Sequence, residues 1–132
     1  MTQQPVKPLC VIQCWDDGVT TDIRLTEIFR RHGARATFNL NAGLHETVRK
    51  LGWVHQSTDV WRLSLQELKD VYQGFPIANH SLVHPFLDRL PTALARKEVL
   101  HGRERLQELF AEAVDGFVWG NLGFGANRIG KA

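Results

Sequence analysis

Blocks of apolar residues, separated by polar and turn-forming residues, run along the chain, and each block predicts one element. Short apolar runs bounded by turn residues indicate three strands, at residues 9–15, 36–40 and 75–79. Apolar residues at helical spacing predict a helix that begins at Thr21 or Asp22 and ends at Gly33, and a long helix over about residues 91–111. Strands and helices that alternate in this way are typical of an α/β fold with a mostly parallel sheet.

The remaining segments give weaker patterns. Ser64 opens a capping box, which predicts a short helix that ends at Gly74. A weak helix is expected at residues 44–51, an irregular segment at 52–62, and a fourth strand at 116–119. No internal repeat is visible beyond the alternation of strands and helices.

The first strand carries both cysteines of the chain. Its nearly continuous apolar run predicts burial on both faces of the sheet. Cys10 and Cys14 would lie roughly 13 Å apart along an extended strand, which is too far for a disulfide. We therefore expect two small buried apolar side chains in place of a redox pair or a metal clip.

Composition limits the classes of partner. The 132 residues include 16 Lys and Arg against 14 Asp and Glu, and the basic residues are scattered, so we expect no nucleic-acid partner. The apolar runs are far shorter than the ~20 residues that cross a bilayer, and no secretory signal pattern opens the chain, which predicts a cytoplasmic protein without a membrane partner.

Two polar clusters follow predicted strands and carry the candidate chemistry. Asp16 and Asp17, followed by Gly18, come directly after the first strand, and His80 and His84 come directly after the third. The carboxyl ends of parallel strands form the edge of a sheet at which α/β proteins bind ligands. Two histidines four residues apart on a helical turn would face the same side and could hold one zinc-type ion with a carboxylate as third ligand. The second carboxylate could then act as a base.

Each cluster alone has a simpler interpretation. An Asp-Asp-Gly sequence after a strand is most often a plain turn, and a His-x-x-x-His sequence is often part of a surface loop. Both clusters fall at strand ends that were predicted from periodicity alone, and this coincidence favours the metal site.

These residues also resemble those of a known family. Residues 14–18 (Cys-Trp-Asp-Asp-Gly) are similar to the first motif of the polysaccharide deacetylase family, Thr-Phe-Asp-Asp-Gly, and residues 80–84 (His-Ser-Leu-Val-His) match its second, His-Ser/Thr-x-x-His. Residues 35–43 resemble the family's segment around Ala-Thr-Phe-Phe. The family is also called the NodB homology domain or carbohydrate esterase family 4. The similarity runs from residue 11 to about residue 119, and three matches in order make it specific.

The resemblance implies a partial (β/α) barrel of about four mostly parallel strands with covering helices. It implies a metal-dependent hydrolase of carbon–nitrogen bonds other than peptide bonds, which removes acetyl groups from N-acetylated or O-acetylated sugars or opens related amides. Asp16 would be the catalytic base, and Asp17, His80 and His84 would hold one divalent ion. Zinc is the expected ion, with cobalt, nickel and manganese as alternatives.

Other polar residues have weaker claims to the site. Thr37 and Asn41 lie at the second predicted strand and could line a pocket, although an ordinary role in a strand and a turn fits them better. Any histidine side chain can act as a proton donor, which makes His45, His55 and His101 formal candidates for that role. We expect solvated or capping roles for all three.

The resemblance weakens toward the end of the chain. The family's third motif, Arg-x-Pro-Tyr-Gly, is absent from residues 117–125, and with it the arginine that would orient the catalytic Asp. We therefore expect an extension at residues 1–8, a partial deacetylase-like domain at 9–119 and a flexible tail at 120–132. The loss of the family pattern suggests a truncated or frame-shifted reading of a longer gene. Open strand edges would favour self-association. The alternative to an enzyme is a non-catalytic remnant that binds metal or saccharide as a subunit or regulator.

Overall fold

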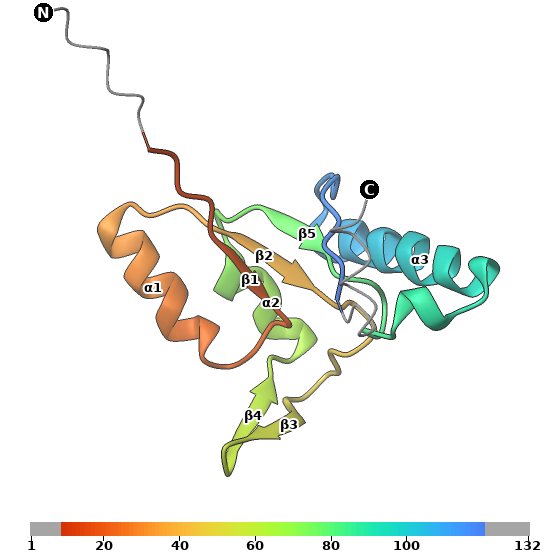
Figure 1. Cartoon of the computed structure of the whole chain (residues 1–132). Helices are drawn as coiled ribbons and strands as arrows, with labels where there is room; N and C mark the ends of the chain where they lie inside the picture. The colour runs from red at the N-terminus through yellow and green to blue at the C-terminus, as the bar shows by residue number, and fades with distance from the viewer. Residues whose placement is uncertain (1–8, 121–132) are drawn as a thin grey trace, which may run out of the picture.

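The computed structural model describes residues 9–120 and contains a parallel sheet, covering helices and a separate hairpin (Figure 1). The sheet has the order β1-β2-β5, with β1 at Cys14–Asp16, β2 at Thr37–Leu40 and β5 at Ile77–Asn79. The helices are α1 (Asp22–His32), α2 (Leu65–Tyr72), α3 (Thr92–Phe110) and the short 3-10 helix η1 (Leu87–Arg89). The hairpin pairs β3 (Lys50–His55) with β4 (Thr58–Arg62).

This architecture confirms the predicted α/β class with a parallel sheet. Helices α1 and α2 pack against each other, and α3 lies beside β5 (Figure 1). Among residues 9–120, no helix combines the length and the apolar character needed to cross a bilayer. The predicted extension at 1–8 and all but the first residue of the predicted tail at 120–132 lie outside the described residues.

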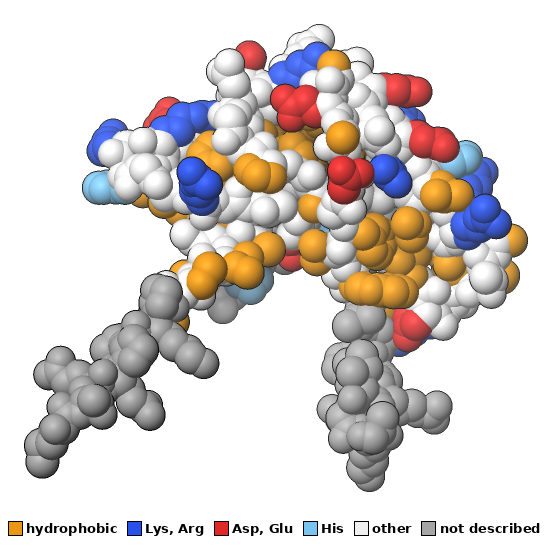
Figure 2. Space-filling view, turned by 90° about the horizontal axis from the view of Figure 1, so that it is seen from above, with side chains coloured by type: hydrophobic (Ala, Val, Ile, Leu, Met, Phe, Trp, Pro, Cys, Tyr) orange, Lys and Arg blue, Asp and Glu red, His pale blue; other side chains and the backbone are white. Residues whose placement is uncertain are grey.

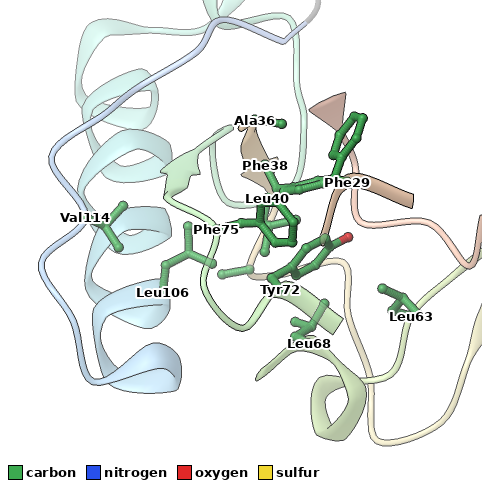
Figure 3. Close-up of a cluster of buried hydrophobic side chains, with 11 residues drawn as sticks. Phe29, Ala36, Phe38, Leu40, Leu63, Leu68, Tyr72, Phe75, Leu106 and Val114 are labelled. Carbon is green, nitrogen blue, oxygen red and sulfur yellow. The ribbon is translucent and has the colours of Figure 1, made fainter. Parts of the chain in front are cut away.

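The main core lies against β2 and the helices that cover it. Phe38 and Leu40 of β2 are fully buried, and the Phe38 ring centroid lies 4.7 Å from that of Tyr72 and 5.3 Å from that of Phe75. Figure 3 shows these side chains gathered beside Leu68 of α2. Each large apolar side chain buried in this way stabilises the fold by about 1.5–3 kcal/mol. The core therefore fixes β2, the central strand, most firmly.

The first strand differs from its prediction. All three residues of β1 are exposed, and Trp15 retains 41% of its accessible surface, so the predicted burial on both faces was wrong. Cys10 and Cys14 are likewise exposed and unpaired as free thiols, which corrects their predicted burial. Within the described residues β1 pairs only with β2, so it is an edge strand with little cover. Figure 2 shows apolar side chains open to solvent on one face of the molecule, and the self-association predicted from open edges stays a prediction.

The hairpin β3–β4 replaces two predicted segments. The weak helix at 44–51 and the irregular segment at 52–62 were both wrong. The strand period was hidden because the register shifts between Leu51 and Trp53, which leaves the glycine between them in a bulge. Gln56 and Ser57 form the turn with positive φ angles of 45° and 64°, a conformation usually signalled by Asn-Gly.

The predicted strand at 116–119 is present only as a single parallel bridge. Phe117 pairs with Asn79, and the Asn79 N–H donates to the Gly116 carbonyl at 2.9 Å. The Val118 N–H in turn donates to the Asn79 carbonyl at 2.9 Å. This segment therefore runs beside β5 and reaches the carboxyl end of the sheet.

The turn after β1 is packed too tightly for any residue but glycine. Gly18 has a φ of 66°, and a Cβ atom there would lie 2.5 Å from Cε1 and 2.8 Å from Nε2 of His45. Its carbonyl accepts a hydrogen bond from the Leu63 N–H at 2.9 Å, which ties the turn to the end of the hairpin. Gly33 has a similar φ of 61°, but nothing lies within 4 Å of its Cβ position.

A buried carboxyl closes the start of α1. Asp22 is 4% exposed, and its Oδ2 accepts hydrogen bonds from the Tyr72 hydroxyl at 2.6 Å and from the Val19 N–H at 3.3 Å. The pKa of Asp22 is raised to about 6, because the effect of burial, to which the nearby Asp17 adds, outweighs the lowering by the two hydrogen bonds. Thr21, the other predicted cap, makes no capping bond through its side chain.

We predict that Gly18→Ala lowers the free energy of unfolding by about 2–5 kcal/mol, from left-handed strain of about 1–2 kcal/mol plus overpacking of about 1–3 kcal/mol. Gly33→Ala is the matched control, because it carries the strain without the contact, and it should cost only about 1 kcal/mol. Urea unfolding followed by circular dichroism measures both. Equal losses in the two variants would contradict the packing of His45 against the turn.

We also predict that Asp22→Asn flattens the pH dependence of stability between about pH 4 and pH 6. The folded carboxyl, with a pKa of about 6, binds its proton more tightly than the unfolded one at 3.8, so the wild-type free energy of unfolding falls as pH rises through this window. The contribution of this group is on the order of 2–3 kcal/mol. Urea unfolding at several pH values gives the difference between wild type and variant, and parallel profiles would show that the carboxyl is not perturbed.

Candidate functional site

Three side chains from two distant parts of the chain meet at the carboxyl edge of the sheet. Asp17 belongs to the turn after β1, and His80 and His84 belong to the loop after β5. Each offers one ligand atom, and these atoms all lie within 4.8 Å of one another. Two imidazole nitrogens and a carboxylate oxygen form a donor set that could hold one divalent cation.

The loop after β5 brings its two histidines together without a helical turn. The sequence predicted such a turn, but Ser81 and His84 adopt positive φ angles of 68° and 58°, so that prediction was wrong. The His84 N–H donates to the Ser81 hydroxyl at 3.1 Å, which closes the loop locally. As a result, the two Nε2 atoms of His80 and His84 lie 3.1 Å apart, with their rings at 60°.

The ring of His80 is held from behind by the segment after α3. His80 is 2% exposed, and its Nδ1 lies 2.9 Å from the Val118 carbonyl oxygen. A carbonyl oxygen can only accept, so Nδ1 carries a proton, and Nε2 is the ring nitrogen that faces Nε2 of His84 at 3.1 Å. A second partner of this kind is what fixes the orientation of a metal-binding histidine. The Asn41 side-chain amide also donates to the His80 carbonyl, so β2 supports the same loop.

Asp17 is held by its backbone, and within residues 9–120 one of its carboxylate oxygens accepts no hydrogen bond. Its φ is 77°, which is rare outside glycine, and its carbonyl accepts a hydrogen bond from Nη1 of Arg62 at 2.7 Å. Its Oδ1 is buried and has no hydrogen-bond partner within residues 9–120, although Nη2 of Arg62 lies 3.6 Å away and Nε2 of His84 lies 3.8 Å away. Burial lowers the pKa of Arg62, whereas the contacts with Asp17 raise it.

Asp16 lies beside this group, and its side chain is 49% exposed. Its Oδ1 accepts a hydrogen bond from the Asn39 side-chain amide at 2.6 Å, and its Oδ2 lies 4.0 Å from Nε2 of His80. The carboxylate is therefore next to the possible ligand atoms and open to solvent. This position suits a group that exchanges protons with a small molecule at the site.

The structure also adds residues that the sequence did not indicate. Arg62 carried no signal, because the hairpin that brings it to Asp17 was not predicted. His45 was expected to be solvated or capping, but it is 4% exposed and its Nδ1 lies 2.8 Å from the Leu63 carbonyl, so that prediction was wrong. Burial lowers the pKa of His45, and Arg62 lowers it further, although the Leu63 bond and Asp17 act in the opposite direction.

The remaining candidates divide between the two ends of the sheet. Asn41 is fully buried at the carboxyl end, where it holds the histidine loop. Thr37 begins β2 and therefore lies at the opposite end, away from the three ligand atoms. His55 and His101 are exposed, on β3 and α3. One signal could have revealed Asn39, since it is a polar residue inside an otherwise apolar strand.

Several solved structures, two of which are described as deacetylases, share this fold. A Streptococcus pyogenes deacetylase, PplD, solved with acetate, superposes with a TM-score of 0.66 at 21% identity, over 87% of this chain and 47% of that one. IcaB from Ammonifex degensii superposes with a TM-score of 0.65 at 15% identity, over 89% of this chain and 53% of that one. The peptidoglycan deacetylase PdaC from Bacillus subtilis superposes with a TM-score of 0.58 at 16% identity, over 91% of this chain and 53% of that one. The chain thus spans about half the length of these proteins.

These likenesses confirm the predicted fold class, a partial (β/α) barrel of the deacetylase type. At such low identity they bear on the fold alone. No curated protein matches the chain at a significant level. The model of the polysaccharide deacetylase family, however, matches residues 3–130, so nearly the whole chain fits it. The chain therefore belongs to the polysaccharide deacetylase family.

Proposed function

We propose that this chain removes acetyl groups from an N-acetylated saccharide by metal-dependent hydrolysis. The observation that carries the proposal is the group of Asp17, His80 and His84 with the carboxylate of Asp16 beside it. Family membership supports the same reaction class. O-acetylated sugars and related amides present the same acyl carbonyl and are alternative substrates.

The three ligand residues fit a divalent ion of the zinc type. In a tetrahedral site with metal–nitrogen distances of about 2.0–2.1 Å, two nitrogens lie roughly 3.3 Å apart, and the Nε2 atoms of His80 and His84 are 3.1 Å apart. Oδ1 of Asp17 is buried and accepts no hydrogen bond within residues 9–120, so a cation could coordinate it beside the ion-paired Arg62, 3.6 Å away. Three protein ligands leave further positions open, as catalytic sites require. Cobalt, nickel and manganese accept the same donor types.

In this mechanism a bound ion supplies Lewis acidity to the acyl carbonyl. The protein supplies the proton transfers and the alignment. Asp16 accepts a proton from the attacking water at its free Oδ2, since its Oδ1 is occupied by Asn39. The water oxygen bonds to the acyl carbon, the carbon–nitrogen bond breaks, acetate is released, and the proton taken up by Asp16 passes to the amine of the sugar. His80, fixed through Nδ1 by Val118, keeps its Nε2 directed at the site throughout.

We predict that the purified chain loaded with zinc retains one ion after dialysis and that His84→Ala weakens this binding by more than about 100-fold, since even residues behind the ligands can contribute 10–100-fold. Elemental analysis and a chelator titration measure the change. His101→Ala is the control, because His101 is exposed on α3, and it should bind zinc like wild type. Equal zinc in wild type and His84→Ala would contradict the ligand assignment.

We predict that the zinc-loaded chain releases acetate from an N-acetylglucosamine oligosaccharide and that a chelator abolishes the release. Asp16→Asn should lower kcat by about 10²–10⁴, the usual contribution of a general base, with the zinc content unchanged. An assay of free acetate measures both. Full activity in Asp16→Asn would contradict the role of this residue. Binding of zinc or saccharide without any turnover would favour the alternative, a non-catalytic binding role.

A further inference from the structure

We propose that Asn39 is a positioning residue that holds the carboxylate of Asp16 in its reactive orientation. This inference rests on the proposed function, because it assigns Asp16 the role of base. Asn39 is the third of the four residues of β2, is fully buried, and is the register partner of Asp16 in β1. It is therefore fixed by the most firmly packed strand of the sheet.

Asn39 contacts both members of the aspartate pair. Its side-chain Nδ2 donates to Oδ1 of Asp16 at 2.6 Å, and its backbone carbonyl accepts the Asp17 N–H at 3.0 Å. One residue thus sets the side chain of the base and the backbone of the neighbouring candidate ligand. The two roles are separable by mutation, because only the first requires the amide side chain.

The polarity of the contact determines which oxygen of Asp16 can react. A carboxylate only accepts hydrogen bonds, so the amide nitrogen of Asn39 must face it, and the reversed amide would bring two oxygens together. The bond occupies Oδ1 and leaves Oδ2, which lies 4.0 Å from Nε2 of His80. The free oxygen is therefore the one that lies beside a candidate ligand atom, Nε2 of His80. The same bond restrains the carboxylate from turning inward to become a further ligand itself.

Stability alone does not account for an asparagine at this position. Oδ1 of Asn39 is buried and has no hydrogen-bond partner in the described part of the chain. A buried oxygen without a partner destabilises a fold, and asparagine is disfavoured inside strands. Phe38 and Leu40 point to the other face of the sheet, and the register partner of Asn39 in β5, on its own face, is the buried apolar residue Ala78. The amide is thus explained by what it does to Asp16.

The test begins with Asn39→Leu in the zinc-loaded chain. The expected result is a loss of about 10–100-fold in kcat, the scale that a misplaced reactive group produces. KM and zinc content should stay at their wild-type values, and the melting temperature should be unchanged or higher. A purely structural role would instead lower the melting temperature and the zinc content together with kcat. Asn39→Ser, which removes the contact without adding volume, provides a second variant should Asn39→Leu fail to fold.

A double-mutant cycle with Asp16→Asn shows whether Asn39 acts through Asp16. If it does, Asn39→Leu has little further effect on kcat once Asp16 has been replaced, so the two losses are far from additive. Independent, multiplying losses would overturn the inference. Wild-type kcat in Asn39→Leu would overturn it as well.

The contact can also be tested without turnover, which separates this inference from the proposed function. In ¹⁵N-labelled protein, the side-chain amide signal of Asn39 is identified by its absence from Asn39→Leu. This signal should shift in Asp16→Asn, because the charged acceptor is lost. An unchanged signal would contradict the contact. A shifted signal in a chain that releases no acetate would contradict the deacetylase activity while leaving the contact established.

Discussion

The site depends on one strained piece of backbone, the left-handed conformation of Asp17. Its φ of 77° is unusual for a residue with a side chain and costs on the order of 1–3 kcal/mol. Two neighbours hold it, since Asn39 accepts its N–H at 3.0 Å and Arg62 donates to its carbonyl at 2.7 Å. A hydrogen bond to a charged group contributes about 1.5–3 kcal/mol, so the Arg62 bond alone is of the size needed to offset the strain.

This constraint explains how the hairpin contributes to the candidate site. Arg62 ends β4 and is 8% exposed, with its guanidinium 5.4 Å from the ring centroid of Trp53. The bulge at Gly52 leaves room for its stem, because a Cβ atom there would lie 3.3 Å from Cγ of Arg62. The Thr20 N–H also donates to the Trp61 carbonyl at 2.8 Å. The turn after β1 is thus hydrogen-bonded on one side to the hairpin and on the other side to β2.

The sequence could predict those parts of the fold that local chemistry determines. Apolar runs identified β2 and β5, the capping box at Ser64 identified α2, and the strand ends pointed to both polar clusters. The hairpin was not predictable, because Gln56 and Ser57 take positive φ without the usual glycine or asparagine. Nor was the role of Arg62, since its partner Asp17 is 45 residues away and no local pattern links the two.

The exposure of β1 and the burial of His45 were missed for a related reason. Burial depends on which elements pack on a segment in the folded chain, whereas sequence periodicity shows only which faces of the segment are apolar enough to be buried. The residues of β1 are apolar enough for a central strand, yet within the described chain β1 pairs on one side only. His45 is polar enough for a surface, yet Gly18 and Leu63 close over it.

A layer of buried asparagines connects the core to the site. Asn39, Asn41 and Asn79 lie at or next to the carboxyl ends of β2 and β5, and each is at most 2% exposed. Each donates through its amide nitrogen, to Asp16, to the His80 carbonyl and to the Val99 carbonyl, respectively. Each also leaves its carbonyl oxygen without a partner in the described chain, at a cost of about 1–3 kcal/mol per buried group. Apolar residues there would give a more stable sheet, but Asp16, the histidine loop and α3 would each lose a hydrogen bond. At this edge of the sheet, the asparagines therefore position neighbouring groups and lower the free energy of unfolding.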